Sequence, residues 1–277
     1  MYLNVTNCSF KFILTIVSPN PTNKLRHYLK HFLRHYWVSN FVDVLHSPFV
    51  FGLQRQCVEK LPTKEFEPIE QLRKQLLNNS SVIFYEDFGA SNKSRSVKVA
   101  ELAKKHLKPA RIAQILSRLV TYTQSQRILE LGTSLGITTA YLAKGASANA
   151  QIHTIEASKE VLNITLQNKL PQVQYHLGTF DEVLPNLLPQ MGPIDYLFID
   201  GNHSYEATLR YFEMAKPFIH NNTVIVFDDI YCSKGMTQAW EEIKQDPMVK
   251  VSVDLFFVGL VFFRKEQVKE HFKLRVF

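Results

Sequence analysis

Cysteine is scarce in this chain and does not occur in pairs. The three cysteines, Cys8, Cys57 and Cys232, are odd in number, widely spaced and free of any C-x-x-C motif. A disulfide framework or a zinc site is therefore not expected, and the composition favours a reducing, cytoplasmic location.

Long apolar runs are also missing. The stretch from Phe10 to Val17 is apolar, but Lys11 interrupts it and it is too short to span a bilayer. No basic segment precedes it and no clear small-residue cleavage site follows, which argues against a signal peptide. We interpret residues 1–20 as an irregular tail, or as sequence upstream of the true start.

The composition is that of a globular protein with a moderate positive charge. The 277 residues are 45% hydrophobic, enough for one large domain or for a main domain with an appendage. Lys and Arg total 32 against 25 Asp and Glu, which gives a net charge of +7. This excess permits an anionic partner without requiring one.

Apolar residues recur at helical spacing from residue 24 to residue 37, with arginine, lysine and histidine on the opposite face. The pattern predicts a basic amphipathic helix. Such a helix could attach the protein to an anionic membrane or to nucleic acid. We favour the simpler interpretation, a helix docked on the body of the protein with its basic face in water.

Further helices are predicted before residue 123. Ser47 followed by Pro48 indicates a helix start, because serine caps free amides and proline fits the first helical position. Residues 21–123 are thus predicted to form a helical extension that serves as a lid or as a contact in a homodimer. The other helices expected there are 68–78, 94–106 and 110–121.

The pattern changes to short apolar strands after residue 124. Helical segments separate the first six strands, which predicts a mostly parallel α/β sheet covered on both faces. The last two strands are joined by a short turn near Leu255 and should pair antiparallel. The seven predicted strands are 127–131, 151–156, 172–177, 195–199, 223–227, 249–254 and 256–263.

Residues 127–139 predict a buried strand, a glycine turn and a helix start, the place where open α/β sheets bind ligands. Gly132 and Gly136 permit backbone shapes that a Cβ would block. Thr133 and Ser134 offer hydroxyls and free amides to a ligand. The spacing is E-x-G-x-x-x-G, which differs from the G-x-G-x-x-G of dinucleotide-binding folds.

Together with the acidic end of the next predicted strand, at Glu156, this turn resembles the S-adenosylmethionine site of class I methyltransferases. The resemblance implies a Rossmann-like sheet of strand order 3-2-1-4-5-7-6 with the seventh strand antiparallel. It implies that Glu156 holds the two ribose hydroxyls, with Thr179 or Phe180 beside the adenine. The other cofactor-binding residues that it implies are Glu130, Gly132, Thr133, Ser134, Gly136, Ala157 and Asp200.

Three carboxylates and an imidazole follow two neighbouring strands of the predicted sheet. Asp200 and His203 come after one strand, and Asp228 and Asp229 after the next. Parallel strands bring their carboxyl ends to one edge, so these groups should meet beside the glycine turn. Because like charges need a cation or protons there, the aspartates suit Mg²⁺. His203 could accept the proton of an acceptor hydroxyl.

From residue 127 onward the chain resembles small-molecule O-methyltransferases that bind a divalent metal, including catechol-type and macrolide sugar enzymes. The D-G-x-H-x-Y motif that begins at Asp200 and the Asp228-Asp229 pair carry the resemblance. It implies that these three aspartates bind the metal and that Asp200 and His203 are catalytic, His203 as the base. The catechol group has Asp-Asn where this chain has Asp-Asp, a departure that concerns metal binding rather than the cofactor.

Three further segments resemble a bacterial methyltransferase group found chiefly in Bacteroidetes. In this sequence they read HSPFVF at 46–51, DFGA at 87–90 and IYCSKGM at 230–236. Within the second segment, Asp87 is interpreted as either a lid acid or a turn residue.

The sequence favours an enzyme that moves a methyl group from S-adenosylmethionine to an oxygen of a small molecule, with residues 124–277 as the cofactor-binding domain. A nucleic-acid methyltransferase would fit the basic helix. However, Asp200-Gly201-Asn202-His203 stands where base N-methyltransferases have a D/N-P-P-Y or F motif. A non-catalytic module that binds the cofactor within an assembly is a third class, which the intact motif residues disfavour.

Overall fold

The structure is a computed structural model that describes residues 23–39, 46–61, 63–86 and 94–276. The expectations for residues 1–20 and for Asp87 lie outside these described residues. The α-helices are α2 (Asn23–Val38), α3 (Pro48–Leu53), α4 (Glu67–Leu77), α5 (Val99–His106), α6 (Ala110–Thr123), α7 (Ile137–Gly145), α8 (Lys159–Leu166), α9 (Phe180–Met191), α10 (Tyr205–Ala215) and α11 (Lys234–Gln245).

The strands form one large sheet and one hairpin. The large sheet has eight strands in the order β10-β8-β9-β7-β6-β3-β4-β5, and β1 pairs with β2 separately. All neighbours in the large sheet are parallel except β9, which runs antiparallel to β7 and to β8. The strands are β1 (Val82–Glu86), β2 (Ser94–Lys98), β3 (Arg127–Leu131), β4 (Gln151–Glu156), β5 (Val173–Leu177), β6 (Ile194–Ile199), β7 (Ile219–Asp228), β8 (Val251–Asp254), β9 (Val258–Phe262) and β10 (Glu270–Lys273).

The predicted sheet is confirmed over its seven strands, which correspond to β3 through β9 and lie in the predicted order. The prediction of seven strands is too low, because β10 adds an eighth strand parallel to β8. This strand has the sequence Glu-His-Phe-Lys and no fully buried residue. Its short polar sequence therefore lacks the apolar alternation that marks a strand.

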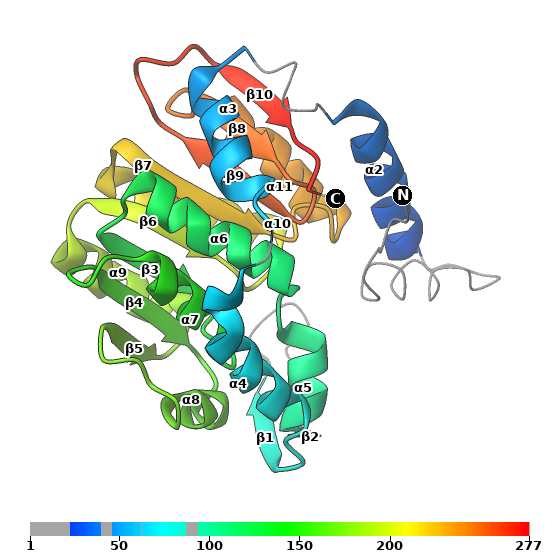
Figure 1. Cartoon of the computed structure of the whole chain (residues 1–277), viewed down its shortest axis with the longest axis vertical. Coiled ribbons are helices and arrows are strands. Elements are labelled where there is room, and N and C mark those ends of the chain that lie inside the picture. Colours follow the sequence, from blue (N-terminus) through cyan, green and yellow to red (C-terminus); the bar gives the residue numbers. More distant parts are fainter. Residues whose placement is uncertain (1–22, 40–45, 62, 87–93, 277) are drawn as a thin grey trace.

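Two layers of helices cover the sheet, one on each face (Figure 1). Helices α3, α6 and α7 form one apolar cluster with the sheet, and α9, α10 and α11 form the other. Along β6, Tyr196 and Phe198 belong to the first cluster, whereas Leu197 and Ile199 belong to the second. This alternation is expected of a strand that is buried on both faces.

The amino-terminal extension contains a β-hairpin as well as helices. Helix α3 begins as predicted, with the Ser47 hydroxyl accepting from the Val50 amide. The helix predicted over 94–106 is wrong in its first part, because residues 94–98 form β2 and α5 begins only at Val99. β2 pairs with β1, which lies earlier in the chain, so local spacing could not reveal it.

Helix α2 packs against the turn between β8 and β9, as the docked interpretation of the basic helix expects. The Phe256 ring contacts Tyr28 and Phe32 edge-on, with centroids 4.9 and 5.1 Å away. His35 Nε2 lies 3.3 Å from a carboxylate oxygen of Asp254, and His31 stacks on Tyr231. Within the described part of the chain, no helix has the length and apolarity needed to cross a membrane.

Replacing Phe256 with alanine should lower the free energy of unfolding by about 3–5 kcal/mol, because the ring is buried and joins α2 to the sheet. Denaturant titration of the full chain measures the change. Phe84→Ala is the matched control, since that ring is 51% exposed and its loss should cost about 1 kcal/mol or less. Equal losses in the two variants would contradict the docking of α2 through Phe256.

Candidate active site

A cavity of about 540 Å³ opens at the carboxyl edge of the sheet, where β3, β4, β6 and β7 end. Its wall on the other side comes from β1, from the end of α5 and from the segment between α5 and α6. The lining residues include Tyr85, Glu86, Lys105, His106, Lys108, Gly132, Ser134, Glu156, Ala157, Thr179, Phe180, Asp200, His203, Asp228 and Asp229. Sequence reasoning missed the first five, which lie in the extension.

Gly132 lets the ends of β3 and β6 approach each other closely. Its φ is +107°, and a Cβ placed there would lie 2.0 Å from the carbonyl oxygen of Asp200. The Asp200 amide donates to the Leu131 carbonyl, and the Gly132 amide donates to the Ile155 carbonyl. Only glycine fits this position, so the turn that brings Asp200 beside the cavity depends on it.

Glu156 ends β4 inside the cavity and is held by backbone amides. Its Oε2 accepts from the Ser134 amide at 2.8 Å, and its Oε1 accepts from the Ser158 amide at 2.9 Å. Burial raises the pKa of Glu156, and these amides oppose the rise. The amides also fix the carboxylate in one orientation, which is what recognition of a diol by two oxygens requires.

Three of the predicted cofactor residues do not line the cavity: Glu130, Thr133 and Gly136. Glu130 is fully buried, and its Oε2 accepts hydrogen bonds from the Thr139 and Thr154 hydroxyls at 2.5 and 2.6 Å. The Thr133 hydroxyl is buried against that of Thr154. Glu130 and Thr133 therefore form buried hydrogen bonds next to the glycine turn and do not face the cavity.

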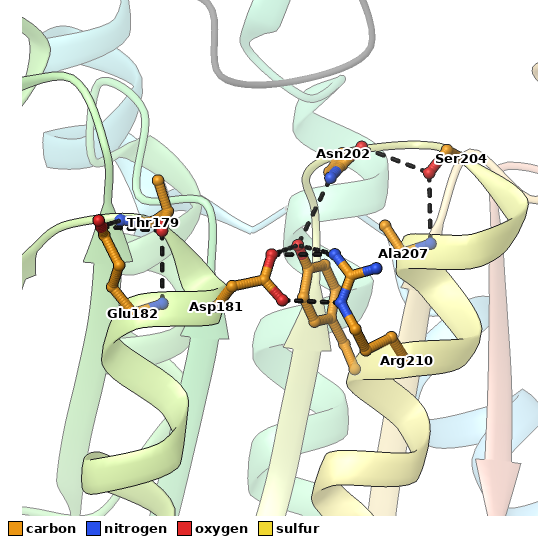
Figure 2. A network of polar contacts seen from close by, with 8 residues as sticks. Thr179, Asp181, Glu182, Asn202, Ser204, Ala207 and Arg210 are labelled. Carbon is orange, nitrogen blue, oxygen red and sulfur yellow. Dashed lines mark hydrogen bonds and ion pairs between the residues drawn. The ribbon is translucent and has the colours of Figure 1, made fainter.

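The predicted adenine neighbours Thr179 and Phe180 do line the cavity, at the start of α9. Thr179 caps this helix in a reciprocal capping box with Glu182 (Figure 2). Figure 2 also shows the Asp181 carboxylate turned toward the Arg210 guanidinium, which donates to it from Nε at 2.7 Å and from an Nη at 2.9 Å. The ion pair joins the start of α9 to the middle of α10.

The predicted acidic cluster forms at the ends of β6 and β7. Among the described residues, Asp200, His203 and Asp228 have ligand atoms that all lie within 4.8 Å of one another. His203 Nε2 is 3.6 Å from Asp200 Oδ1. Asp229 lines the same cavity but is not part of this group, so the set differs from the three predicted aspartates.

Lys108 lies inside this cluster and was not predicted. Its Nζ is 2.5 Å from Asp228 Oδ2 and 3.0 Å from Asp200 Oδ2. The side chains of Lys108 and Asp228 are only 11% and 3% exposed. A single lysine between two helices carries no motif, so nothing in the sequence marked it. Only the fold brings it to the strand ends.

Charges in the cluster depend on one another. Burial and the repulsion of Asp200 raise the pKa of Asp228 well above its usual range. Burial acts on Asp200 in the same direction, but Lys108 and His203 hold the pKa of Asp200 below its ordinary value. Burial would lower the pKa of Lys108, yet Asp200 and Asp228 together raise it, so the ammonium stays charged.

As arranged, the cluster does not fit a divalent ion. The distances alone would let Asp200, His203 and Asp228 share one. However, an ion on the same oxygens would stand about 4 Å from the Lys108 ammonium, at a repulsion of roughly 8 kcal/mol for charges of two and one. Mg²⁺ binding by the three predicted aspartates therefore stays a prediction that the position of Lys108 opposes.

Comparisons with known proteins also point to a methyltransferase domain. Residues 129–230 match the family model of a methyltransferase domain. Over 157 residues the chain is 29% identical to a catechol O-methyltransferase of Niastella koreensis, which covers 54% of this chain and 70% of that protein. A catechol O-methyltransferase of Mycobacterium tuberculosis is 30% identical over 132 residues, 46% of this chain and 58% of that protein.

The fold is that of known O-methyltransferase structures. An O-methyltransferase from Bacillus cereus in complex with SAH superposes with a TM-score of 0.53 at 20% identity, covering 80% of this chain and 100% of that one. An O-methyltransferase from Streptomyces achromogenes in complex with SAM has a TM-score of 0.51 at 20% identity and covers 70% and 98%. The sheet is thus the Rossmann-like sheet seen in these O-methyltransferase structures.

Glu130 should make stability depend on pH, because burial raises its pKa to about 8. An acid whose pKa is higher in the folded state stabilises fully below the unfolded value, about 4.3, and loses this contribution as pH rises toward 8. Unfolding titrations should show wild type losing about 2–5 kcal/mol relative to Glu130→Gln between pH 5 and pH 9. Exposed Glu101→Gln serves as the control. A stability difference between wild type and Glu130→Gln that does not change with pH would contradict the raised pKa of Glu130.

Proposed function

We propose that this protein is an S-adenosylmethionine-dependent O-methyltransferase that acts on a small molecule. The observation that carries the proposal is the Glu156 carboxylate, held by the Ser134 and Ser158 amides at the end of β4 and turned into the cavity beside Gly132. The methyltransferase-domain match and the catechol O-methyltransferase relatives support the same activity.

We assign two parts of this single cavity to the cofactor and to the acceptor. Glu156, Ala157 and Phe180 line the part at β4 and α9, which we assign to the ribose and adenine of the cofactor. Asp200 and His203 line the part at β6, which we assign to the acceptor. S-adenosylmethionine, when bound, supplies a methyl group that is already activated by its positive sulfur. The protein must therefore chiefly align the acceptor with it.

His203 is the proposed base for the acceptor hydroxyl. Its ring lines the cavity, and its Nε2 lies 3.6 Å from Asp200, which can orient the ring and stabilise the imidazolium. Asp200 thereby acts beside both the base and the cofactor. No step of the proposed reaction runs through a metal.

We also propose that residues 21–123 serve as the lid of the domain formed by residues 124–277. Tyr85 and Glu86 of β1 and His106 at the end of α5 line the cavity, which supports this role for the extension. A small acceptor suits a cavity of about 540 Å³. A contact in a homodimer and a cytoplasmic location stay predictions, and the comparisons do not favour the nucleic-acid or non-catalytic alternatives.

Replacing Glu156 with alanine should weaken S-adenosylmethionine binding by about 1.5–3 kcal/mol, because charge-assisted hydrogen bonds to the ribose would be lost. Isothermal titration calorimetry measures the affinity. Glu160→Ala removes the same charge from α8 outside the cavity and should bind like wild type. Unchanged affinity in Glu156→Ala would remove the ribose assignment.

His203→Gln should leave cofactor affinity within about twofold of wild type but cut turnover by roughly 10²-fold to 10⁴-fold, the usual effect of losing a positioned base. Turnover is followed as S-adenosylhomocysteine released with a panel of phenols and other hydroxylated small molecules. His220→Gln is the matched control, since His220 pairs with Asp195 away from the cavity. Undiminished turnover in His203→Gln would exclude it as the base.

A further inference from the structure

Lys108 lines the cavity and is held there by contacts on two sides. It lies between α5 and α6, and its carbonyl oxygen accepts from an Arg73 Nη at 2.8 Å, which fixes the backbone of this connection to α4. Its Nζ lies 5.8 Å from the centroid of the Phe198 ring on β6. The ammonium is therefore held by the extension on one side and by two strand ends on the other.

The position of this ammonium coincides with that of the cation that the acidic cluster requires. Asp200 and Asp228 come from neighbouring parallel strands and are both largely buried, so a positive charge or a bound proton must accompany them. Lys108 already contacts one oxygen of each carboxylate, at 3.0 and 2.5 Å. A divalent ion would have to displace it before binding the same oxygens.

We propose that Lys108 is the resident cation of the acceptor site, in place of a divalent metal ion, so that methyl transfer by this protein needs no metal. The proposal rests on the proposed function, because it concerns the acceptor part of the same cavity. It goes beyond that function by assigning the positive charge of the site to a residue of the chain itself.

The number of donors on the ammonium sets the class of acceptor. A lysine ammonium carries three N–H donors, and the carboxylates of Asp200 and Asp228 account for two of them. The third can be given to one oxygen of an acceptor, whereas a metal ion can hold both oxygens of a vicinal diol. The acceptor class that fits is a molecule with a single reacting hydroxyl, such as a monophenol.

The step balances without a metal. The acceptor O–H bond breaks and its proton passes to His203. The oxygen forms its new bond to the methyl carbon as the bond from that carbon to sulfur breaks, and the electron pair of that bond stays on sulfur. Lys108, which lines the same cavity as His203, stabilises the negative charge that develops on the oxygen.

The first test is a titration of the full-length wild-type protein with Mn²⁺, followed by electron paramagnetic resonance, and with Mg²⁺, followed by the melting temperature. We expect no saturable Mn²⁺ binding up to about 5 mM and no rise in melting temperature, because Lys108 repels the ion from the oxygens that it would need. Binding of Mn²⁺ with a dissociation constant below about 1 mM would overturn the proposal, and this readout needs no variant.

The second test removes the ammonium. Lys108→Met should bind Mn²⁺ at least about tenfold more tightly than wild type, because it leaves Asp200 and Asp228 without their partner. Lys104→Met is the control, since Lys104 is exposed in the last turn of α5 and lies outside the cavity. A folded Lys108→Met protein that binds Mn²⁺ no better than Lys104→Met contradicts the assignment. If Lys108→Met does not fold, the titration of the wild-type protein still tests whether the site excludes a divalent ion.

Calorimetry with S-adenosylmethionine on the same preparations separates the two proposals. Wild type that binds S-adenosylmethionine but also binds Mn²⁺ tightly would overturn the role of Lys108 and leave the methyltransferase function standing. Wild type that binds neither would instead remove the proposed function on which this inference rests.

Discussion

The contact of the Lys108 ammonium with Asp200 and Asp228 is the interaction on which the candidate site depends. Two carboxyl groups at the ends of parallel strands cannot be buried together as anions without a compensating positive charge or a bound proton. Lys108 supplies that charge from the amino-terminal extension, at 2.5 Å from one carboxylate and 3.0 Å from the other. This ion cluster links the amino-terminal extension to the ends of β6 and β7 beside the cavity.

The rest of the cavity follows from backbone geometry. Gly132 has a φ that favours glycine and leaves no room for a side chain against the Asp200 carbonyl, so β3 and β6 converge there. The turn after Gly132 presents the Ser134 amide to Glu156, which fixes that carboxylate at the end of β4 beside the cavity. Underneath, the buried carboxyl of Glu130 accepts from two threonine hydroxyls and supports the same turn. One glycine turn thus positions both Glu156 and Asp200 at the cavity.

Much of this arrangement could be predicted from sequence because it depends on patterns among neighbouring residues. Apolar strands that alternate with helices determine the parallel sheet, and the carboxyl ends of its strands must share an edge, so Glu156, Asp200 and Asp228 were found. The β1–β2 hairpin, the strand β10 and Lys108 were missed for a common reason. Each acquires its role through pairing or contact with residues distant in the chain. β10 and Lys108 carry no apolar period or motif of their own, whereas β1 has the apolar run Val-Ile-Phe-Tyr and could have been recognised as a strand. Glu130, which was predicted to bind the cofactor, is fully buried and does not line the cavity, and its role stays a prediction.

The account can be tested most directly by a crystal structure of the full chain grown with S-adenosylhomocysteine and an excess of Mg²⁺. The predicted result shows both ribose hydroxyls within hydrogen-bond distance of the Glu156 carboxylate, with the Lys108 ammonium still between Asp200 and Asp228 and no metal ion on these oxygens. A ligand bound away from Glu156 would contradict the cofactor site. An Mg²⁺ ion on the aspartates with Lys108 turned away would contradict the role of the lysine.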